Sequence, residues 1–343
     1  MTPAPPGRFV GATTDSLANR TLPAVAELWR VETGRGVTSP LIEHGGLLIA
    51  TATSRDVTAF DPETGQRIWQ RRVSGPVIGG ATLHAGRLLV AVGDDDGGIQ
   101  ALDPASGTTL WTSSIGSVIH APGAAYGRAF AGTEMGVVAS VDIESGAEMW
   151  RIRLSRPVSS TPLPIDGQIV VTAEDTLYVL AAENGLIRWR MPLAAHVGAA
   201  PAARGDTLYL PLRSGELIAI AVNGRRELWR ASFGDHPILA TPALAPDGAI
   251  YVLNRAAELW RFRPGGAAPV RVAELGGAAT AAFSASENGA LVGRVDGALF
   301  LVRPEDGEIL WRHDFDDAIR APVAVHGNAI FVPLLRGTVV KLR

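Results

Sequence analysis

The chain has 343 residues, of which 47% are hydrophobic and 19% are charged, so the composition predicts a folded chain with a large core. Its 31 Lys+Arg and 34 Asp+Glu give a net charge of −3, and Lys341 is its single lysine, which argues against nucleic-acid binding by phosphate neutralisation. Cysteine is absent, which excludes disulfides, thiolate nucleophiles and Cys-ligated metals.

The first segment, residues 1–23, is rich in Pro, Ala and Thr, and we expect it to be a disordered lead to a single domain over residues 24–343. It has neither the charged start nor the apolar centre of a signal peptide. Residues 19–21 fit a glycosylation acceptor, a short motif that recurs by chance. No apolar run approaches the roughly 18 residues of a membrane span, so we expect no direct membrane span.

Tryptophans recur along the chain at nearly constant intervals. Successive gaps are 40, 42, 39, 39 and 40 residues, and the gap before Trp311 is twice as long, with Val270 at its midpoint. This spacing defines eight slots, of which Val270 occupies one. The other seven slots hold Trp29, Trp69, Trp111, Trp150, Trp189, Trp229 and Trp311.

Each slot follows a short apolar strand and a turn. In the turn Asp103-Pro-Ala-Ser-Gly107, Asp opens a type I turn and Gly supplies a positive φ. The strand before it, residues 99–102, is apolar at its first and fourth positions, as in all eight copies, so both faces should be buried. Two more short strands precede that strand. Eight four-stranded antiparallel units predict an all-β, eight-bladed β-propeller.

The last unit is incomplete, because only three strands can follow Trp311 before the sequence ends. Residues 26–30, which include Trp29, precede the first complete unit and have no inner strands of their own. We therefore predict that residues 28–30 pair antiparallel with the strand containing Val340. The N-terminal strand would then complete the last blade and close the propeller.

The segment Ile99-Gln-Ala-Leu-Asp-Pro-Ala-Ser-Gly-Thr-Thr-Leu-Trp111 resembles the Ala-Leu-Asp-x-x-Thr-Gly-x-x-x-Trp signature of the pyrroloquinoline-quinone-like β-propeller repeat family. The resemblance covers about residues 24–343 and is greatest for the BamB-like branch of outer-membrane protein assembly factors. It implies a non-catalytic scaffold that acts as a monomer or a complex subunit and binds protein partners of a cell-envelope assembly. It also implies a periplasmic or outer-membrane-associated location, with a cytoplasmic one as the alternative because the N-terminus shows no signal peptide.

A second branch, the quinoprotein dehydrogenases, implies the alternative of a divergent quinone- or small-ligand-binding propeller. Those enzymes have long insertions, a vicinal cysteine pair, a calcium ion and a catalytic aspartate, whereas this chain has no cysteine and blades of about 40 residues. We therefore predict no catalytic residue, cofactor or metal. The acidic run at residues 94–96 lacks the spaced ligands of a calcium loop and is interpreted as a hairpin loop.

When the units are aligned on their opening proline, the residue two positions earlier is small or polar in nearly every blade. We interpret this column as the lining of a channel mouth, where innermost strands would crowd together. The candidate binding residues in it are Thr38, His120, Ser160 and Arg320. His120 and Arg320 are its bulky polar members, and hydration of the channel is a simpler role for them than ligand binding.

The slot tryptophans are predicted to dock between neighbouring blades, since a solvated turn would not require an indole ring seven times. Trp260 lies outside the period, on the strand expected to pair with the slot at Val270. We hypothesise that Trp260 fills the space left by the missing slot tryptophan, rather than forming a ligand-stacking platform.

Overall fold

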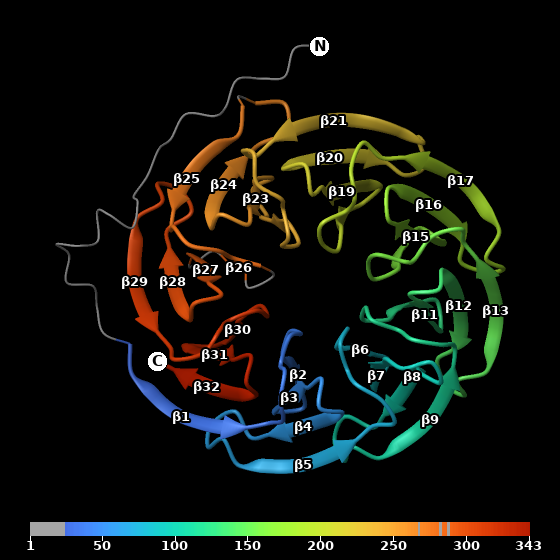
Figure 1. Cartoon of the computed structure of the whole chain (residues 1–343), viewed down its shortest axis with the longest axis horizontal. Helices are drawn as coiled ribbons and strands as arrows, with labels where there is room; N and C mark the ends of the chain where they lie inside the picture. Colours follow the sequence, from blue (N-terminus) through green and yellow to red (C-terminus); the bar gives the residue numbers. More distant parts are fainter. Residues whose placement is uncertain (1–24, 267, 281–282, 287–288) are drawn as a thin grey trace. The chain divides into compact units, whose positions relative to one another are not determined.

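The computed structural model describes residues 25–266, 268–280, 283–286 and 289–343, and its regular elements are all strands (Figure 1). The predicted lead at residues 1–23 and the motif at residues 19–21 lie outside the described residues. Within the described part, no helix has the length and apolar character needed to cross a membrane.

The strands form eight four-stranded antiparallel sheets, which confirms the predicted eight-bladed β-propeller. Blade 1 consists of β2 (Ile42–His44), β3 (Leu47–Thr51), β4 (Asp56–Phe60) and β5 (Arg67–Arg72). Blade 2 consists of β6 (Ala81–His84), β7 (Arg87–Val92), β8 (Gly98–Leu102) and β9 (Thr109–Ser114). Blade 3 consists of β10 (Gly123–Ala125), β11 (Arg128–Gly132), β12 (Val137–Asp142) and β13 (Glu148–Arg153). Blade 4 consists of β14 (Leu163–Ile165), β15 (Gln168–Ala173), β16 (Thr176–Ala181) and β17 (Ile187–Pro192). Blade 5 consists of β18 (Ala202–Arg204), β19 (Thr207–Pro211), β20 (Glu216–Ala221) and β21 (Arg226–Ser232). Blade 6 consists of β22 (Ala243–Leu244), β23 (Ile250–Leu253), β24 (Glu258–Phe262) and β25 (Val270–Glu274). Blade 7 is β26 (Phe283–Ser286), β27 (Gly289–Gly293), β28 (Ala298–Val302), β29 (Ile309–Asp314), and blade 8 is β30 (Ala324–His326), β31 (Ala329–Pro333), β32 (Thr338–Leu342) with β1 (Glu27–Glu32).

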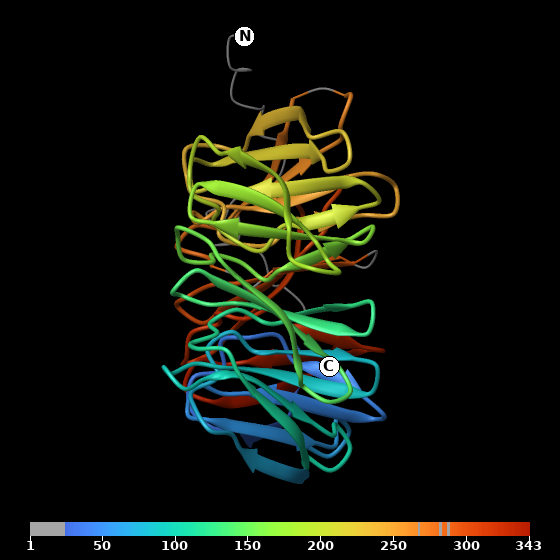
Figure 2. The same cartoon turned by 90° about the vertical axis from the view of Figure 1, so that its right-hand side faces the viewer.

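The chain divides into two compact units. Blades 1–4 belong to the unit of residues 29–194 and 333–341, and blades 5–7 belong to the unit of residues 195–332 with short terminal segments. In the first unit the blades follow one another in chain order, with the fourth strands β5, β9, β13 and β17 on the outside (Figure 1). Figure 2 shows the neighbouring sheets of blades 1 and 2 from the side, in blue and cyan.

Burial differs between the strands of one blade in the way the sequence predicts. All five residues of β8 are buried, so both faces of this third strand are covered by neighbouring blades. On the fourth strand, β9, Trp111 and Ser113 are buried while Leu110 and Thr112 are exposed. A fourth strand therefore packs one face against the neighbouring blade and presents the other to solvent.

The N-terminal strand completes blade 8, as predicted, in the order β1-β32-β31-β30. Ala26 and Arg343 exchange two backbone hydrogen bonds of 3.0 Å, and the Thr33 N–H donates to the Gly337 carbonyl at 2.8 Å. This reciprocal pattern is that of an antiparallel ladder. The Thr33 hydroxyl also donates to Gly337, at 3.0 Å.

Deletion of residues 1–34 should therefore expose the edge of β32, where Val339, Val340 and Leu342 are fully buried. We expect this variant to aggregate and to melt below the parent chain, as measured by light scattering and thermal denaturation. Deletion of residues 1–20, which keeps β1, is the control and should change neither property. A monomeric long deletion that melts with the parent would show that β1 does not close the fold.

Candidate functional site

In blades 1–3 the turn before the fourth strand is held by its first residue, an aspartate. The Asp103 carboxylate accepts hydrogen bonds from the backbone of Ala105 and Ser106 at 3.0 and 2.8 Å, and from the Ser106 hydroxyl at 3.0 Å. The hydrogen bond from the Ser106 N–H is the main reason that the pKa of Asp103 lies below its usual value. Gly107 closes the turn with a φ of 69°. The carboxylate thus fixes a turn that presents one glycine and one carbonyl to the preceding blade.

Four slot tryptophans in the first unit lie against such turns. Each indole N–H donates to the carbonyl of the second turn residue, Trp29 to Pro62 at 3.2 Å, Trp69 to Pro104 at 3.2 Å, Trp111 to Ile143 at 3.0 Å and Trp150 to Ala182 at 2.9 Å. A Cβ added to the turn glycines Gly65, Gly107, Gly146 and Gly185 would lie 2.9, 2.5, 2.5 and 2.6 Å from the same rings. The ring therefore occupies the place of a side chain, and the positive φ also favours glycine.

In the second unit the slot tryptophans have other surroundings. The Trp229 ring packs edge-on against Phe262 of blade 6, with centroids 4.9 Å apart, and also contacts Tyr209 at 6.0 Å. Trp311 is 8% exposed. An aromatic side chain of the next blade can thus replace the glycine-and-carbonyl contact.

The hypothesis that Trp260 replaces the missing tryptophan of the Val270 slot is wrong. Trp260 pairs with Arg271, whereas Val270 pairs with Arg261, so the two side chains lie on opposite faces of blade 6. The Trp260 ring is buried against Phe233 of blade 5, with centroids 6.2 Å apart. Val270 instead faces the blade 6–7 cluster.

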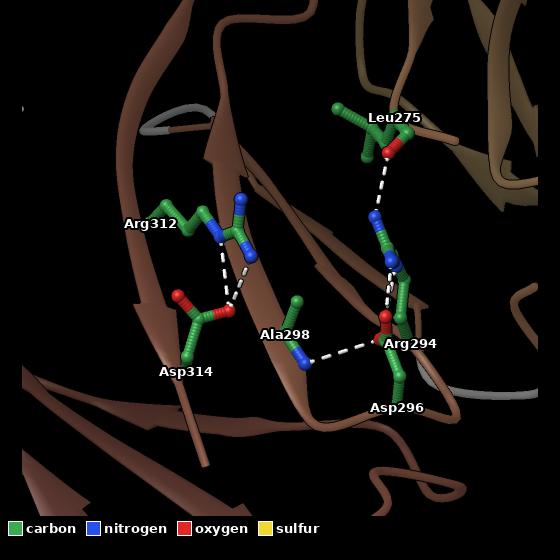
Figure 3. Close-up of polar contacts among 6 residues, drawn as sticks. All are labelled: Leu275, Arg294, Asp296, Ala298, Arg312 and Asp314. Atoms are coloured by element: carbon green, nitrogen blue, oxygen red, sulfur yellow. Dashed lines mark hydrogen bonds and ion pairs between the residues drawn. The ribbon is translucent and has the colours of Figure 1, made fainter. Parts of the chain in front are cut away.

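Without an indole ring, the junction between blades 6 and 7 closes backbone to backbone. A Cβ added to Gly307, the last residue of the blade 7 turn, would lie 1.5 Å from the Val272 carbonyl oxygen of β25. Figure 3 shows a second link, in which the Arg294 guanidinium of blade 7 donates to the Leu275 carbonyl of blade 6 at 2.8 Å. Asp296 orients Arg294 through Nε at 3.0 Å. An arginine and a close backbone contact thus hold this junction together.

The four predicted binding residues have unlike surroundings. Thr38 is half-buried, and its hydroxyl donates to the Ile78 carbonyl at 3.5 Å. Ser160 is 2% exposed, and its hydroxyl lies 2.6 Å from that of Thr172. Arg320 is exposed, in the segment between β29 and β30 of the second unit. The buried hydroxyl of Ser160 is therefore not available to a ligand.

The strand register differs from the proline alignment that grouped these four residues. Counting five residues back from the hairpin ends His44, Ala125, Ile165 and His326 gives Ser39, His120, Ser160 and Ala321. Blades 1 and 8 have one more residue between proline and hairpin than blades 3 and 4, so Thr38 and Arg320 do not belong to the column. A Cβ on Gly79, the blade 2 member, would lie 2.5 Å from the His120 backbone, which explains the small residues in this column.

His120 is the titratable member of that column. Burial lowers the pKa of His120 below its ordinary value of 6.5, while the charge of Glu134 and the backbone of Val158 oppose the shift. Glu134 also accepts a hydrogen bond from the Ser117 hydroxyl at 2.7 Å. His120 is therefore held neutral, in a polar cluster at one end of blade 3.

The acidic run at residues 94–96 forms the turn between β7 and β8, as its interpretation as a hairpin loop requires. Gly97 donates its N–H to the Asp94 carbonyl at 2.9 Å, and Asp94 lies 3.4 Å from Arg55. In the described part of the chain, no three His, Cys, Asp or Glu side chains cluster so that they could hold a metal ion.

A surface groove of about 680 Å³, not found from the sequence, lies on blade 3 beside Glu134. We call it the Met135 groove. It is lined by Glu134, Met135, Arg153, Leu154, Ser155, Arg156 and Pro157. Met135 is 67% exposed in the turn between β11 and β12. A methionine in a turn whose counterparts in blades 1, 2 and 5 are polar or glycine was the signal that could have revealed it.

The contacts of Trp111 generate a stability prediction. Replacement of Trp111 by alanine should lower the free energy of unfolding by about 3–5 kcal/mol, because a buried ring and its hydrogen bond are both lost. Denaturant titration measures this change. The neighbouring Leu110→Ala, whose side chain is 46% exposed, is the control and should cost less than about 1 kcal/mol. A similarly small loss for Trp111→Ala would contradict docking of the ring.

The depressed pKa of His120 predicts a pH dependence of stability. In the unfolded chain His120 takes up a proton as the pH falls below about 6.5, whereas in the folded chain it stays neutral until a lower pH. The stability that the folded chain has above pH 6.5 is therefore lost as the pH falls from about 6.5 to the pKa of His120 in the folded state. Urea titrations should show a larger loss between pH 7.5 and pH 5 for the parent chain than for His120→Asn. Equal losses in both proteins would contradict the neutral state of the half-buried His120.

The model of the family described as outer membrane protein assembly factor BamB matches residues 23–113 and 95–243 of the chain. The BamB protein of Shewanella oneidensis is 23% identical over 274 residues, which cover 68% of this chain and 69% of that protein. That of Burkholderia pseudomallei is 24% identical over 350 residues, covering 93% and 88%. The match to the protein of the same name from Alteromonas naphthalenivorans spans about half of its length, 54%.

Solved structures show the same fold at low identity. BamB from Moraxella catarrhalis superposes with a TM-score of 0.74 at 16% identity, covering 93% of this chain and all of that one. A quinohemoprotein alcohol dehydrogenase from Comamonas testosteroni gives 0.72 at 13% identity, covering 93% and 76%. Structural likeness at this level carries the fold alone, so the family rests on the sequence model, which matches more than half of the chain. The chain belongs to the outer membrane protein assembly factor BamB family.

Proposed function

We propose that this protein is a non-catalytic scaffold of the cell envelope that binds protein partners during outer membrane protein assembly. Membership of the BamB family, and the similarity to the BamB proteins of Shewanella oneidensis and Burkholderia pseudomallei, support this role. We further propose that the slot tryptophans are structural residues that keep the blades in place. A rigid scaffold can then present its surface turns without changing shape on binding.

The Met135 groove is the observation on which the proposed binding role depends most. Met135 offers a flexible, polarisable side chain with 67% exposure, of the kind that protein-binding surfaces use as an adaptable anchor. Charged groups of both signs flank it, since Glu134 lies in the same turn and Arg156 forms a 2.7 Å ion pair with Glu174. An exposed apolar anchor inside a charged rim is typical of protein-docking surfaces.

The groove suits a polypeptide better than a small ligand. It is wide and shallow, whereas small-ligand sites enclose most of the ligand surface. The alternative role, a quinone- or small-ligand-binding propeller, would use a channel mouth near His120 and Arg320, with Thr38 and Ser160. Of these four residues, Ser160 has a hydroxyl that is buried against Thr172 and is not available to a ligand. No contact described above favours that alternative.

We expect deletion of the gene in its native host to lower the amount of outer membrane proteins in the membrane fraction, measured by quantitative proteomics. The parent gene should restore them, and Met135→Glu should not, because a carboxylate beside Glu134 removes the apolar anchor and adds like charge. Met149→Glu is the matched control, since Met149 is a 50% exposed methionine on the fourth strand of the same blade.

Both variants should melt like the parent chain, so that a failure to restore reports binding rather than folding. Unchanged outer membrane protein levels after deletion would contradict the proposed function. Restoration by Met135→Glu equal to that by Met149→Glu would show that the groove is not the binding surface.

A further inference from the structure

A cavity of about 530 Å³ lies between blades 6 and 7, at the junction whose slot holds Val270 instead of tryptophan. Its walls are largely apolar. They include Ala243, Ala245, Tyr251, Ala285, Pro304 and Glu305. The cavity is therefore large enough for a bicyclic aromatic ring, and it lies at the junction where the repeat supplies none.

Pro304 carries the acceptor that the other junctions use. It is the second residue of the blade 7 turn, as Pro62, Pro104, Ile143 and Ala182 are in blades 1–4, and their carbonyls each accept an indole N–H. Among the described residues, no hydrogen bond reaches the Pro304 carbonyl. Pro304 also lines the cavity, so a residue with an unsatisfied backbone acceptor belongs to its wall.

The original ring position is closed, so the occupant must lie beside it. Gly307 packs directly on the Val272 backbone, which removes the space above the turn glycine. The open space lies next to Pro304 and is bounded on the other side by Tyr251, which is 6% exposed. A planar ring can enter between these two walls, with Tyr251 as an aromatic partner.

Two carboxylates line the cavity, of which Glu305 is exposed to solvent and Asp247 is matched by arginines. Asp247 binds the Arg263 guanidinium and lies 3.8 Å from that of Arg261. Burial raises the pKa of Tyr251, so its phenol stays neutral. The cavity interior therefore favours a neutral ring over a charged one.

We propose that the cavity between blades 6 and 7 binds a planar aromatic ring with an N–H donor, of which indole is the simplest example. The ring packs between Tyr251 and the blade 7 turn and donates its N–H to the Pro304 carbonyl. A free indole compound and a tryptophan side chain of a partner polypeptide share this chemistry.

Isothermal titration of the folded chain with indole tests the proposal. We expect saturable one-to-one binding, and binding about 5- to 10-fold weaker for 1-methylindole, which lacks the donor and so loses one hydrogen bond. N-acetyltryptophanamide distinguishes the sources. Affinity at least equal to that of indole identifies a tryptophan side chain as the ligand, and binding of indole alone identifies a small molecule.

Two variants and one positive control locate the bound ring. Ala245→Trp fills the cavity from the β22–β23 turn, and Ala285→Trp fills it from β26, since both residues line it, so each should abolish indole binding while the chain remains folded by circular dichroism. Trp69→Ala, which vacates the junction at Pro104 and Gly107, should gain a second indole site and a higher melting temperature with indole.

The proposal is overturned if the parent chain shows no saturable binding up to about 5 mM indole, a concentration that would detect millimolar affinity. It is also overturned if indole binds equally well to whichever of the two filled variants is folded. Equal affinities for indole and 1-methylindole would show that the bound ring does not donate a hydrogen bond to the Pro304 carbonyl, and would contradict that part of the proposal.

Discussion

The contact of an indole ring with the turn glycine of the next blade is the interaction on which much of this structure depends. At Trp111 and Trp150 it joins residues 32 apart in the sequence, and it combines an apolar surface with one directed hydrogen bond. The turn supplies both halves of the binding site for the ring, a glycine without a side chain and a carbonyl, and in blades 1–3 an aspartate holds the turn in place. A sheet that could not be stable alone is thereby fixed between its neighbours.

The contacts that close the junctions between blades are not all the same, and the junction that lacks the indole ring is the one beside which a ligand cavity lies. The Trp229 junction replaces the glycine contact with the Phe262 ring, and the Val270 junction replaces it with a backbone contact and the Arg294 link. Packing at native density leaves little free space at most junctions. The cavity between blades 6 and 7 lies beside the junction that lacks the indole, and in the proposed complex the Pro304 carbonyl accepts the N–H of the bound ring.

The repeat made the fold predictable, because tryptophan spacing and paired apolar positions are properties of the sequence alone. Pairing of β1 with β32 was equally predictable, since one unit lacked a strand and the other chain end had one to spare. The column of candidate binding residues could not be predicted correctly. One extra residue after the prolines of blades 1 and 8 changes the strand register there, and no local feature of the sequence marks it. The face of Trp260 was missed because strand parity alone does not say which neighbour a face meets.

A double-mutant cycle of Trp111→Ala with Gly146→Ala tests the docking contact most directly, with the free energy of unfolding as the measured quantity. The added methyl group would lie 2.5 Å from the Trp111 ring, while the strain of a φ of 72° is present in both backgrounds and cancels. The account predicts that Gly146→Ala destabilises the parent chain by at least about 1 kcal/mol more than it destabilises Trp111→Ala. Additive effects, within about 0.3 kcal/mol, would contradict it.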